Sequence, residues 1–106
     1  MSINSMIITA LTPIAPTAFH EYTGTATTYM TFYTYNQRAG LIADDDEKTT
    51  VYSVQLDIFG KGNIETVAQQ AKQALKALGF ARTSEIEMYE STTKTFRKSI
   101  SLRVSI

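Results

Sequence analysis

The chain alternates apolar and polar residues most clearly over residues 50–59. Its apolar side chains fall at even positions and its polar ones at odd positions: Tyr52, Val54, Leu56 and Ile58 against Ser53, Gln55 and Asp57. Successive side chains of a strand point to opposite faces of a sheet. The pattern therefore predicts a strand whose even positions face the core.

A helical pattern follows this strand. Gly60 and Gly62 close the strand, Asn63 is a candidate N-cap and Gly79 a candidate C-terminal cap. Between the caps, apolar residues recur at a spacing of three or four, at Ile64, Val67, Ala68, Ala71, Ala74, Leu75 and Leu78. The spacing predicts an amphipathic helix that buries one stripe against a sheet.

The start of the chain predicts a short helix and then a loop. Apolar residues lie at helical spacing from Ile3 to Leu11 behind Ser2, a candidate N-cap, and Pro13 and Pro16 end that pattern. Residues 17–28 are rich in Thr, Ala and Gly and have no clean period. We expect a loop there that contains at most a short strand.

Residues 28–35 are aromatic and β-branched, which predicts another strand. Its two faces carry Met30, Phe32 and Thr34 on one side and Tyr29, Thr31, Tyr33 and Tyr35 on the other. Residues 36–48 then collect Asn, Gly and the acidic run Asp44, Asp45, Asp46 and Glu47. This composition predicts the loop of a long hairpin.

Two further strands are predicted near the C-terminus. Residues 84–89 place Ile86 and Met88 inward and Glu85 and Glu87 outward. In residues 95–106 the predicted inner row is Phe96, Ile100, Leu102, Val104 and Ile106, and the outer row is Arg97, Ser99, Ser101, Arg103 and Ser105. The element order α-β-β-α-β-β predicts an α+β fold with an antiparallel-rich sheet and helices packed on one face.

The composition narrows the class of protein. A chain of 106 residues that is 43% hydrophobic predicts one globular domain over residues 1–106. Ten basic residues balance ten acidic ones, so no net field attracts nucleic acid or an anionic membrane, and self-association is less opposed. The sequence has no cysteine, no secretory signal and no apolar run of about 20 residues. We expect synthesis in the cytoplasm and no membrane contact.

Three features could carry chemistry, and each has a simpler explanation. His20 is the only histidine and has no nucleophile in a recognisable order around it. Asp44, Asp45 and Asp46 could hold Mg²⁺ or Ca²⁺, but they lack the spacing of an EF-hand loop, which favours a solvated turn. Residues 60–62, Gly-Lys-Gly, lack the spacing of a phosphate loop. We therefore expect no enzymatic activity, no cofactor and no bound metal.

Three stretches of the sequence resemble the tail terminator and tail completion proteins of long-tailed bacteriophages. They are Phe32-Tyr33-Thr34-Tyr35-Asn36 with the acidic run after Ala43, then Val54-Gln55-Leu56-Asp57-Ile58-Phe59-Gly60-Lys61, and finally Leu78-Gly79-Phe80 with Tyr89-Glu90 and Phe96-Arg97-Lys98. The resemblance spans residues 29–104. It implies a virion subunit, assembled in the host cytoplasm, that forms a ring, in many such phages a hexamer, at the head-proximal end of the tail. There it would contact the tail tube protein and the head connector, with DNA passing through the lumen.

Charged and aromatic residues outside the predicted core are the candidate interface with other subunits or tail partners. They are Arg38, Asp44, Asp45, Asp46, Glu47, Arg97, Arg103, Tyr33 and Tyr35. The alternative is a small nucleic-acid-binding module, because tyrosines on one strand face can stack bases. Such platforms normally have Lys and Arg around them, and only Arg38 is close in sequence.

Overall fold

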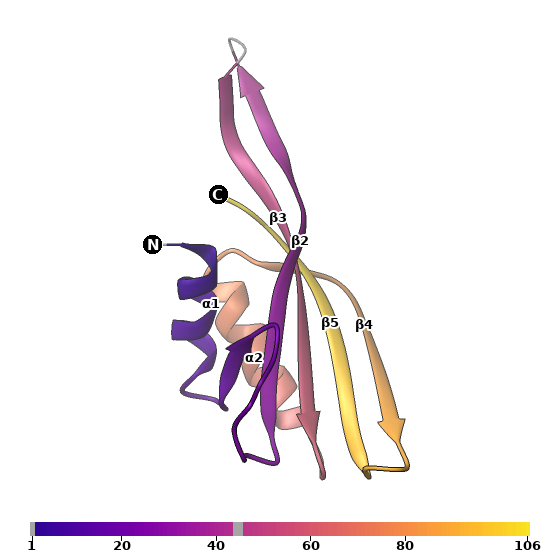
Figure 1. The fold of residues 1–106 in the computed structure, drawn as a ribbon. Helices are drawn as coiled ribbons and strands as arrows, with labels where there is room; N and C mark the ends of the chain where they lie inside the picture. The colour runs from indigo at the N-terminus through magenta and orange to yellow at the C-terminus, as the bar shows by residue number, and fades with distance from the viewer. Residues whose placement is uncertain (1, 44–45) are drawn as a thin grey trace.

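A computed structural model of the protein describes residues 2–43 and 46–106, except for the side chains of residues 38, 40–43 and 46–48. The elements in chain order are α1 (Ile3–Leu11), β1 (Thr17–Phe19), β2 (Tyr29–Ala43), β3 (Asp46–Gly60), α2 (Glu65–Ala77), β4 (Ala81–Glu90) and β5 (Thr95–Ser105). The strands form one sheet in the spatial order β1-β2-β3-β5-β4, and both helices lie on one face of it (Figure 1). The predicted α+β fold is confirmed.

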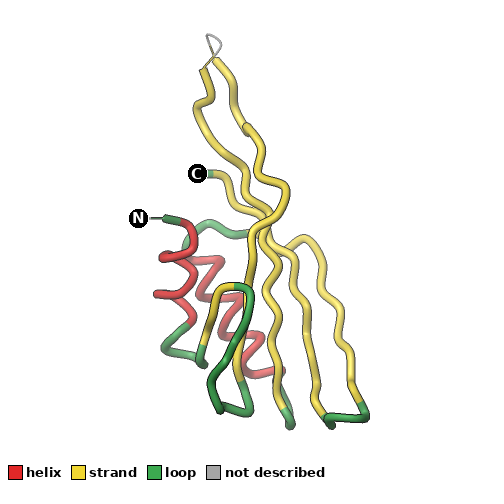
Figure 2. The backbone as a smooth tube through the Cα atoms, in the orientation of Figure 1, coloured by secondary structure: helices red, strands yellow, loops and turns green. Residues whose placement is uncertain are grey.

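The segment predicted as a loop with at most a short strand contains β1. This strand pairs in parallel with β2, from Thr17 opposite Met30 to Phe19 opposite Phe32. The other three strand pairs of the described chain are antiparallel, so the sheet is mixed. Residues 20–28 return to β2 as a loop (Figure 2).

The predicted loop is wrong for residues 36–43 and 46–48, because β2 and β3 include them. Their pairing extends from Tyr29 opposite Phe59 to Ala43 opposite Asp46, with three register shifts between residues 35 and 42. Bulges let an antiparallel pair absorb residues such as Asn36, whose φ is 52°, so turn-type composition does not end these strands. The resulting hairpin arm, residues 36–43 and 46–50, rises past the other strands (Figure 1).

The core lies between the sheet and the two helices. The predicted inner residues of β3 and β5 that are buried are Val54, Leu56, Ile58, Ile100, Leu102 and Val104. Met30 and Phe32 of β2 are buried beside them, on a face that the pattern did not distinguish from the other. The helices contribute Ile7 and Leu11 from α1 and Ala68, Ala71 and Leu75 from α2. Removal of these side chains from water is the main force that holds the helices on the sheet.

Helix α2 ends where the glycine pattern predicts and begins one residue later than expected. Asn63 Oδ1 accepts a hydrogen bond of 2.9 Å from the N–H of Glu65, but the N-cap is Ile64. At the other end Gly79 has φ 97°, and the N–H groups of Gly79 and Phe80 donate to carbonyls of the last turn at 3.0 and 3.1 Å. Glycine adopts this left-handed conformation without strain, which explains its place at the helix end.

The predicted facing of β4 is wrong. Ile86 is 63% exposed on the face without helices, whereas Glu85 and Glu87 lie opposite Ile100 and Lys98 of β5, on the helix face. The cause is the position of β4 at the sheet edge, where its helix-side neighbours include cations rather than apolar side chains. The ion pairs described below satisfy these glutamates.

Leu78 and Ile106, which the patterns place in the core, are also exposed. Leu78 lies just beyond α2, and Ile106 just beyond β5. Each continues a correct periodicity past the point where the element ends. A hydrophobic pattern alone does not mark that point within a residue or two.

Candidate assembly surface

The face of the sheet without helices, here called the open face, carries the odd positions of β2, β3 and β5 and the even positions of β4. Strand register arranges its side chains in four rows across the sheet: Tyr29, Phe59, Arg97 and Met88; Thr31, Asp57, Ser99 and Ile86; Tyr33, Gln55, Ser101 and Ser84; and Tyr35, Ser53 and Arg103. The open face is therefore aromatic along β2, polar along β3 and β5, and apolar at part of β4.

Aromatic rings stack along the first row. The ring centre of Tyr22, in the loop after β1, lies 4.5 Å from that of Tyr29, and Tyr29 lies 4.8 Å from Phe59. The guanidinium carbon of Arg97 is 5.4 Å from the centre of the Phe59 ring, within the range of a cation–π interaction. This row is a packed strip of rings that ends in a cation beside Met88.

Arg97 is also held by Asp57, whose side chain is 8% exposed. Arg97 Nη2 donates to Asp57 Oδ2 at 3.0 Å, Ser99 Oγ donates to Oδ1 at 2.7 Å, and Gln55 Nε2 donates to Oδ1 at 3.1 Å. Neighbouring donors thus satisfy both oxygens of the carboxylate. The contacts position Arg97, which is 42% exposed, at the surface.

Two shallow hollows flank Arg97. One of about 420 Å³ is lined by Phe59, Met88, Tyr89, Glu90, Thr95 and Arg97, and one of about 280 Å³ by His20, Glu21, Tyr22, Tyr29, Thr31, Asp57, Phe59 and Arg97. His20 has φ 68°, and its ring stacks on Tyr33 with centres 5.9 Å apart. The hollows present rings and one fixed cation, features that suit contact with another protein surface.

Tyr33, Tyr35 and Arg103, predicted at an interface, all lie on the open face. Tyr35 is 41% exposed, and its ring centre lies 6.1 Å from that of Tyr33. Arg103 is exposed and lies opposite Ser53, in the same row as Tyr35. The structure thus brings these three residues to one region of the open face.

The other predicted interface residues belong to the hairpin arm. The backbone of Arg38 pairs with Val51 on β3, and the backbones of Asp46 and Glu47 begin β3. Asp44 and Asp45 lie outside the described residues. Arg97 lies beside Phe59, which is 13 residues from Asp46 along β3, roughly 40 Å at strand rise. The predicted residues in the described part of the chain are therefore spread along the length of the sheet and do not form one cluster.

Sequence reasoning missed a cluster of charges on the helix face. Lys98 is 6% exposed in the middle of this face and forms an ion pair with Glu65 at the start of α2. Its Nζ also lies 3.9 Å from Glu85 and 3.8 Å from Glu87, while Lys72 Nζ lies 3.1 Å from Glu85. The signal in the sequence was Lys98 itself, which interrupts the apolar inner row of β5 and so requires carboxylates nearby.

The ion pair shifts the pKa values of both partners. The hydrogen bond to Glu65 raises the pKa of Lys98, although its burial acts in the opposite direction. The hydrogen bonds from Lys98 and then Gln69, which donates at 2.9 Å, lower the pKa of Glu65. Both shifts favour the charged forms. The cluster links α2, β4 and β5 without an apolar contact.

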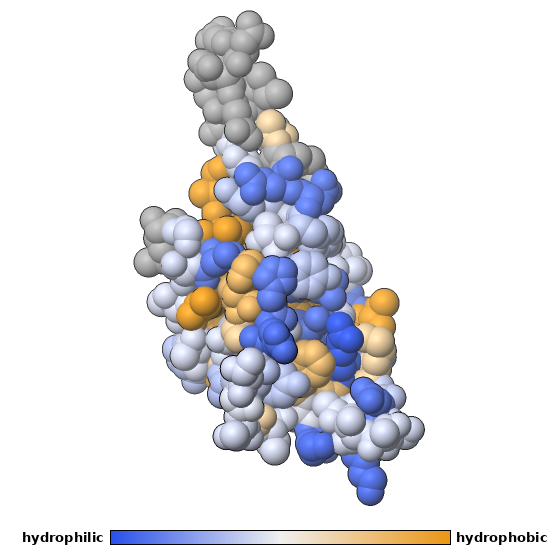
Figure 3. Space-filling model, in the orientation of Figure 1, coloured by the Kyte–Doolittle hydropathy of each residue, from blue (hydrophilic) through white to orange (hydrophobic). Residues whose placement is uncertain are grey.

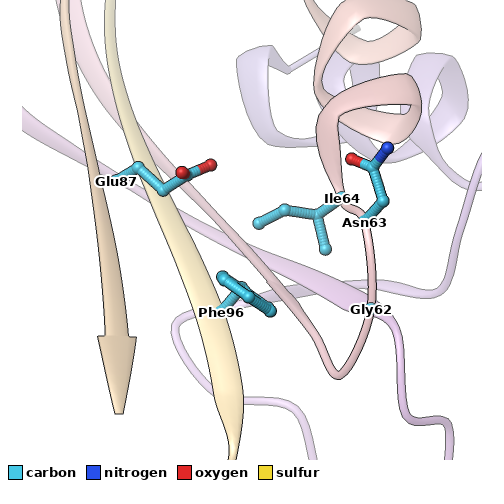
Figure 4. A pocket seen from close by; sticks show the side chains of 5 residues that line it. All are labelled: Gly62, Asn63, Ile64, Glu87 and Phe96. Carbon is cyan, nitrogen blue, oxygen red and sulfur yellow. The ribbon is translucent and has the colours of Figure 1, made fainter.

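A hollow of about 390 Å³ lies next to this cluster, between the start of α2 and strands β4 and β5. Figure 4 shows Ile64 and Phe96 directed into it, with Glu87 and Asn63 at its rim. The ring of Tyr89 lies 4.7 Å from that of Phe96. The floor is apolar and the rim is polar, with no paired nucleophile and base among the lining residues.

The described residues contain no group of three His, Cys, Asp or Glu side chains that could hold a metal ion. The alternative cation site at Asp44, Asp45 and Asp46 falls on residues whose side chains lie outside that description. Within the described part of the chain, no helix is long and apolar enough to span a membrane.

The space-filling view shows hydrophobic patches at both sides of the body with hydrophilic residues between them (Figure 3).

Comparison with known proteins gives a likeness among solved structures. No protein-family model matches the sequence, and no curated protein matches it. Among solved structures, the chain is similar to a chain of the "Virion of native gene transfer agent (GTA) particle", with a TM-score of 0.66 and 10% identity. The likeness covers 98% of this chain and 93% of the other. At this identity the two chains share a fold.

Proposed function

We propose that the chain is a structural subunit of a phage-like virion. The observation that supports this role is the fold likeness to a chain of a gene transfer agent virion, which extends over 98% of the protein. Within this role we further propose that the subunit forms a ring, in hexameric form, at the head-proximal end of the tail. There it ends growth of the tail tube and joins the tail to the head connector.

The surfaces of the molecule suit assembly. The open face offers aromatic, apolar and charged groups that the core does not use. The proposal assigns the chain no enzymatic activity and no cofactor. Its partners are further copies, the tail tube protein and the head connector, and DNA passes through the ring lumen. Assembly takes place in the host cytoplasm, and the subunit then remains in the virion.

The alternative, a nucleic-acid-binding module on the tyrosine face, makes a different prediction. The ring of Tyr29 is stacked between Tyr22 and Phe59, and the ring of Tyr33 against His20. Base stacking would have to displace these contacts or use Tyr35 alone. A fluorescence anisotropy titration with single-stranded DNA, in which Tyr35→Ala weakens binding severalfold, would favour this alternative.

Deletion of the gene in a strain that produces the particle tests the proposed function. Electron microscopy should show heads and tails that are not joined, with tails of irregular length. A plasmid copy of the chain should restore joined particles of normal length. Normal joined particles in the deletion strain would contradict the proposal.

A further inference from the structure

Strands β2 and β4 leave backbone edges without partners among the described strands. On its outer side β2 pairs with β1 only from Met30 to Phe32, so no described strand covers the edge beyond Phe32. At the opposite side of the sheet, β4 pairs with β5 alone over its ten residues. Uncovered edges of this length are ready to pair with another chain unless they are blocked.

We propose that copies of the chain join edge to edge, with β4 of one copy pairing with β2 of the next. This inference rests on the ring-forming role proposed above and names the contact between its subunits. The two edges lie on opposite sides of the sheet, so the contact is head to tail. Such a contact can repeat and close into a ring.

The strand directions fit this pairing. Each of the three pairs that lead from β2 through β3 and β5 to β4 is antiparallel, so β4 runs opposite to β2. A ring whose strands are tilted to its axis, as in a closed barrel, keeps these directions in every copy and staggers neighbouring edges along the strands. The stagger needed here is about four residues, because Ile86 shares a row with Thr31 and must reach the level of Tyr35 in the next copy. The new pair is therefore antiparallel and continues the pattern of the sheet across the subunit boundary.

Exposed side chains at the two edges also suit each other. Ile86 and Met88 of β4 are 63% and 42% exposed on the open face, and Tyr35 of β2 is 41% exposed on the same face. Joining the edges makes the open face continuous, which places aliphatic side chains beside tyrosines and removes both from water.

The charges of the two strands are opposite. In strand β4, Lys72, Lys98 and Arg82 pair with Glu85 and Glu87, so Glu90 is the carboxylate that the strand contributes to a contact. Strand β2 contains Arg38 and no acidic residue. Opposite charges therefore favour β2 over another β4 as the partner strand. A second copy that presents β2 is thus the occupant that the edge favours.

Engineered cysteines test the contact in a protein that has none of its own. Tyr35→Cys is combined with Ser84→Cys, Ile86→Cys or Met88→Cys, which share its face at successive positions. Within one chain β2 and β4 are three strand spacings apart, about 14 Å, too far for a disulfide. Mild oxidation should give a ladder of dimers, trimers and larger species on a non-reducing gel in at least one combination. The matched control, Tyr35→Cys with Glu87→Cys, places the thiols on opposite faces and should give none.

Lysine variants supply a second readout. Ile86→Lys places a charge in the contact at an exposed position, so the fold should persist by circular dichroism while sedimentation velocity shows at least a tenfold weaker assembly. Leu78→Lys makes the same change at an exposed site beyond α2 and should leave assembly unchanged. Equal assembly of the two lysine variants would overturn the proposal. So would disulfide dimers formed by Ile86→Cys alone, or a wild-type protein that stays monomeric at the highest concentration reached.

These outcomes separate the two proposals. If no ladder forms but particles still need the chain for joining, the virion role stands and the edge pairing is wrong. If the ladder forms and the deletion strain still makes joined particles, the pairing stands and the virion role is wrong.

Discussion

Arg97 Nη2 lies 3.0 Å from Asp57 Oδ2 across the β3–β5 pair, on the face of the sheet without helices. The carboxylate is nearly buried, although most of its row is polar, because Arg97, Ser99 and Gln55 enclose it. The pair belongs to the architecture of the open face. The contact with Asp57 fixes the guanidinium of Arg97 between the two hollows.

Asp57→Ala should lower the free energy of unfolding by about 1–3 kcal/mol, because three donors lose their common acceptor. Urea denaturation followed by circular dichroism measures the change. Arg97→Ala and the double variant complete a cycle, and the coupling energy should be about 0.5–2 kcal/mol. A coupling near zero would mean that the two residues stabilise the sheet independently.

The ion pair between Lys98 and Glu65 predicts how stability depends on pH. The lowered pKa of Glu65 means that its contribution is present above the unfolded value of about 4.3 and is lost as the pH falls through the folded pKa. The raised pKa of Lys98 means that its contribution is complete below about 10.4 and is lost as the pH rises through the folded pKa. Glu65→Gln should therefore flatten the acid side of the curve.

Urea melts at several pH values from about 3 to about 7 measure how the free energy of unfolding falls on the acid side. The wild-type protein should lose more stability than Glu65→Gln over this interval. Gln70→Glu, on the solvent side of α2, is a control that adds a carboxylate without this partner. Parallel curves for wild type and Glu65→Gln would show that the pair does not contribute.

Leu75→Ala should cost about 2–5 kcal/mol, because the side chain is fully buried in the core between α2 and the sheet. Leu78→Ala removes the same atoms at a site that is 38% exposed and should cost less than about 1 kcal/mol. Thermal and urea unfolding of the two variants compare the same truncation at a buried site and at an exposed one. Similar losses at both sites would mean that α2 is rotated from its described position.

Replacement of Asp44, Asp45 and Asp46 together by Asn should leave the fold intact and weaken assembly. The expected loss is about 1–3 kcal/mol for each contact that is desolvated and little for exposed ones. The fraction of tails of normal length joined to heads measures assembly, and circular dichroism measures the fold. Lys76→Gln, on the exposed side of α2, controls for loss of a charge. Normal joined particles from the triple variant would leave the acidic run as a solvated turn.

The sequence was sufficient for the elements that have one clear apolar row. Val54, Leu56 and Ile58 are buried because β3 lies in the middle of the sheet, where alternation and burial coincide. The same reasoning assigned the two faces of β4 the wrong way round. At a sheet edge the charged neighbours Lys72 and Lys98 decide which face of the strand points inward. Local pattern carries no information on such neighbours from other elements.

The hairpin arm and the candidate surface show the same limit. Turn-forming composition around Asn36 suggested a loop, but backbone pairing with β3 overrides it through bulges. Arg97 was placed on the outer row correctly, yet its partner Asp57 is 40 residues away and could not be paired with it from spacing alone. The resemblance to tail proteins suggested a ring without naming the edges that would form it.

The position of β5 between β3 and β4 has a consequence for synthesis of the subunit. This strand is translated after both of its neighbours, and it alone joins β4 to the rest of the sheet. On the ribosome, β4 therefore has no sheet partner until residues 95–105 have emerged, and the β3–β5 pair, which forms at the same stage, has the largest sequence separation of the described strand pairs. A nascent chain cannot display a finished β4 edge or open face, so only completed subunits are competent to assemble.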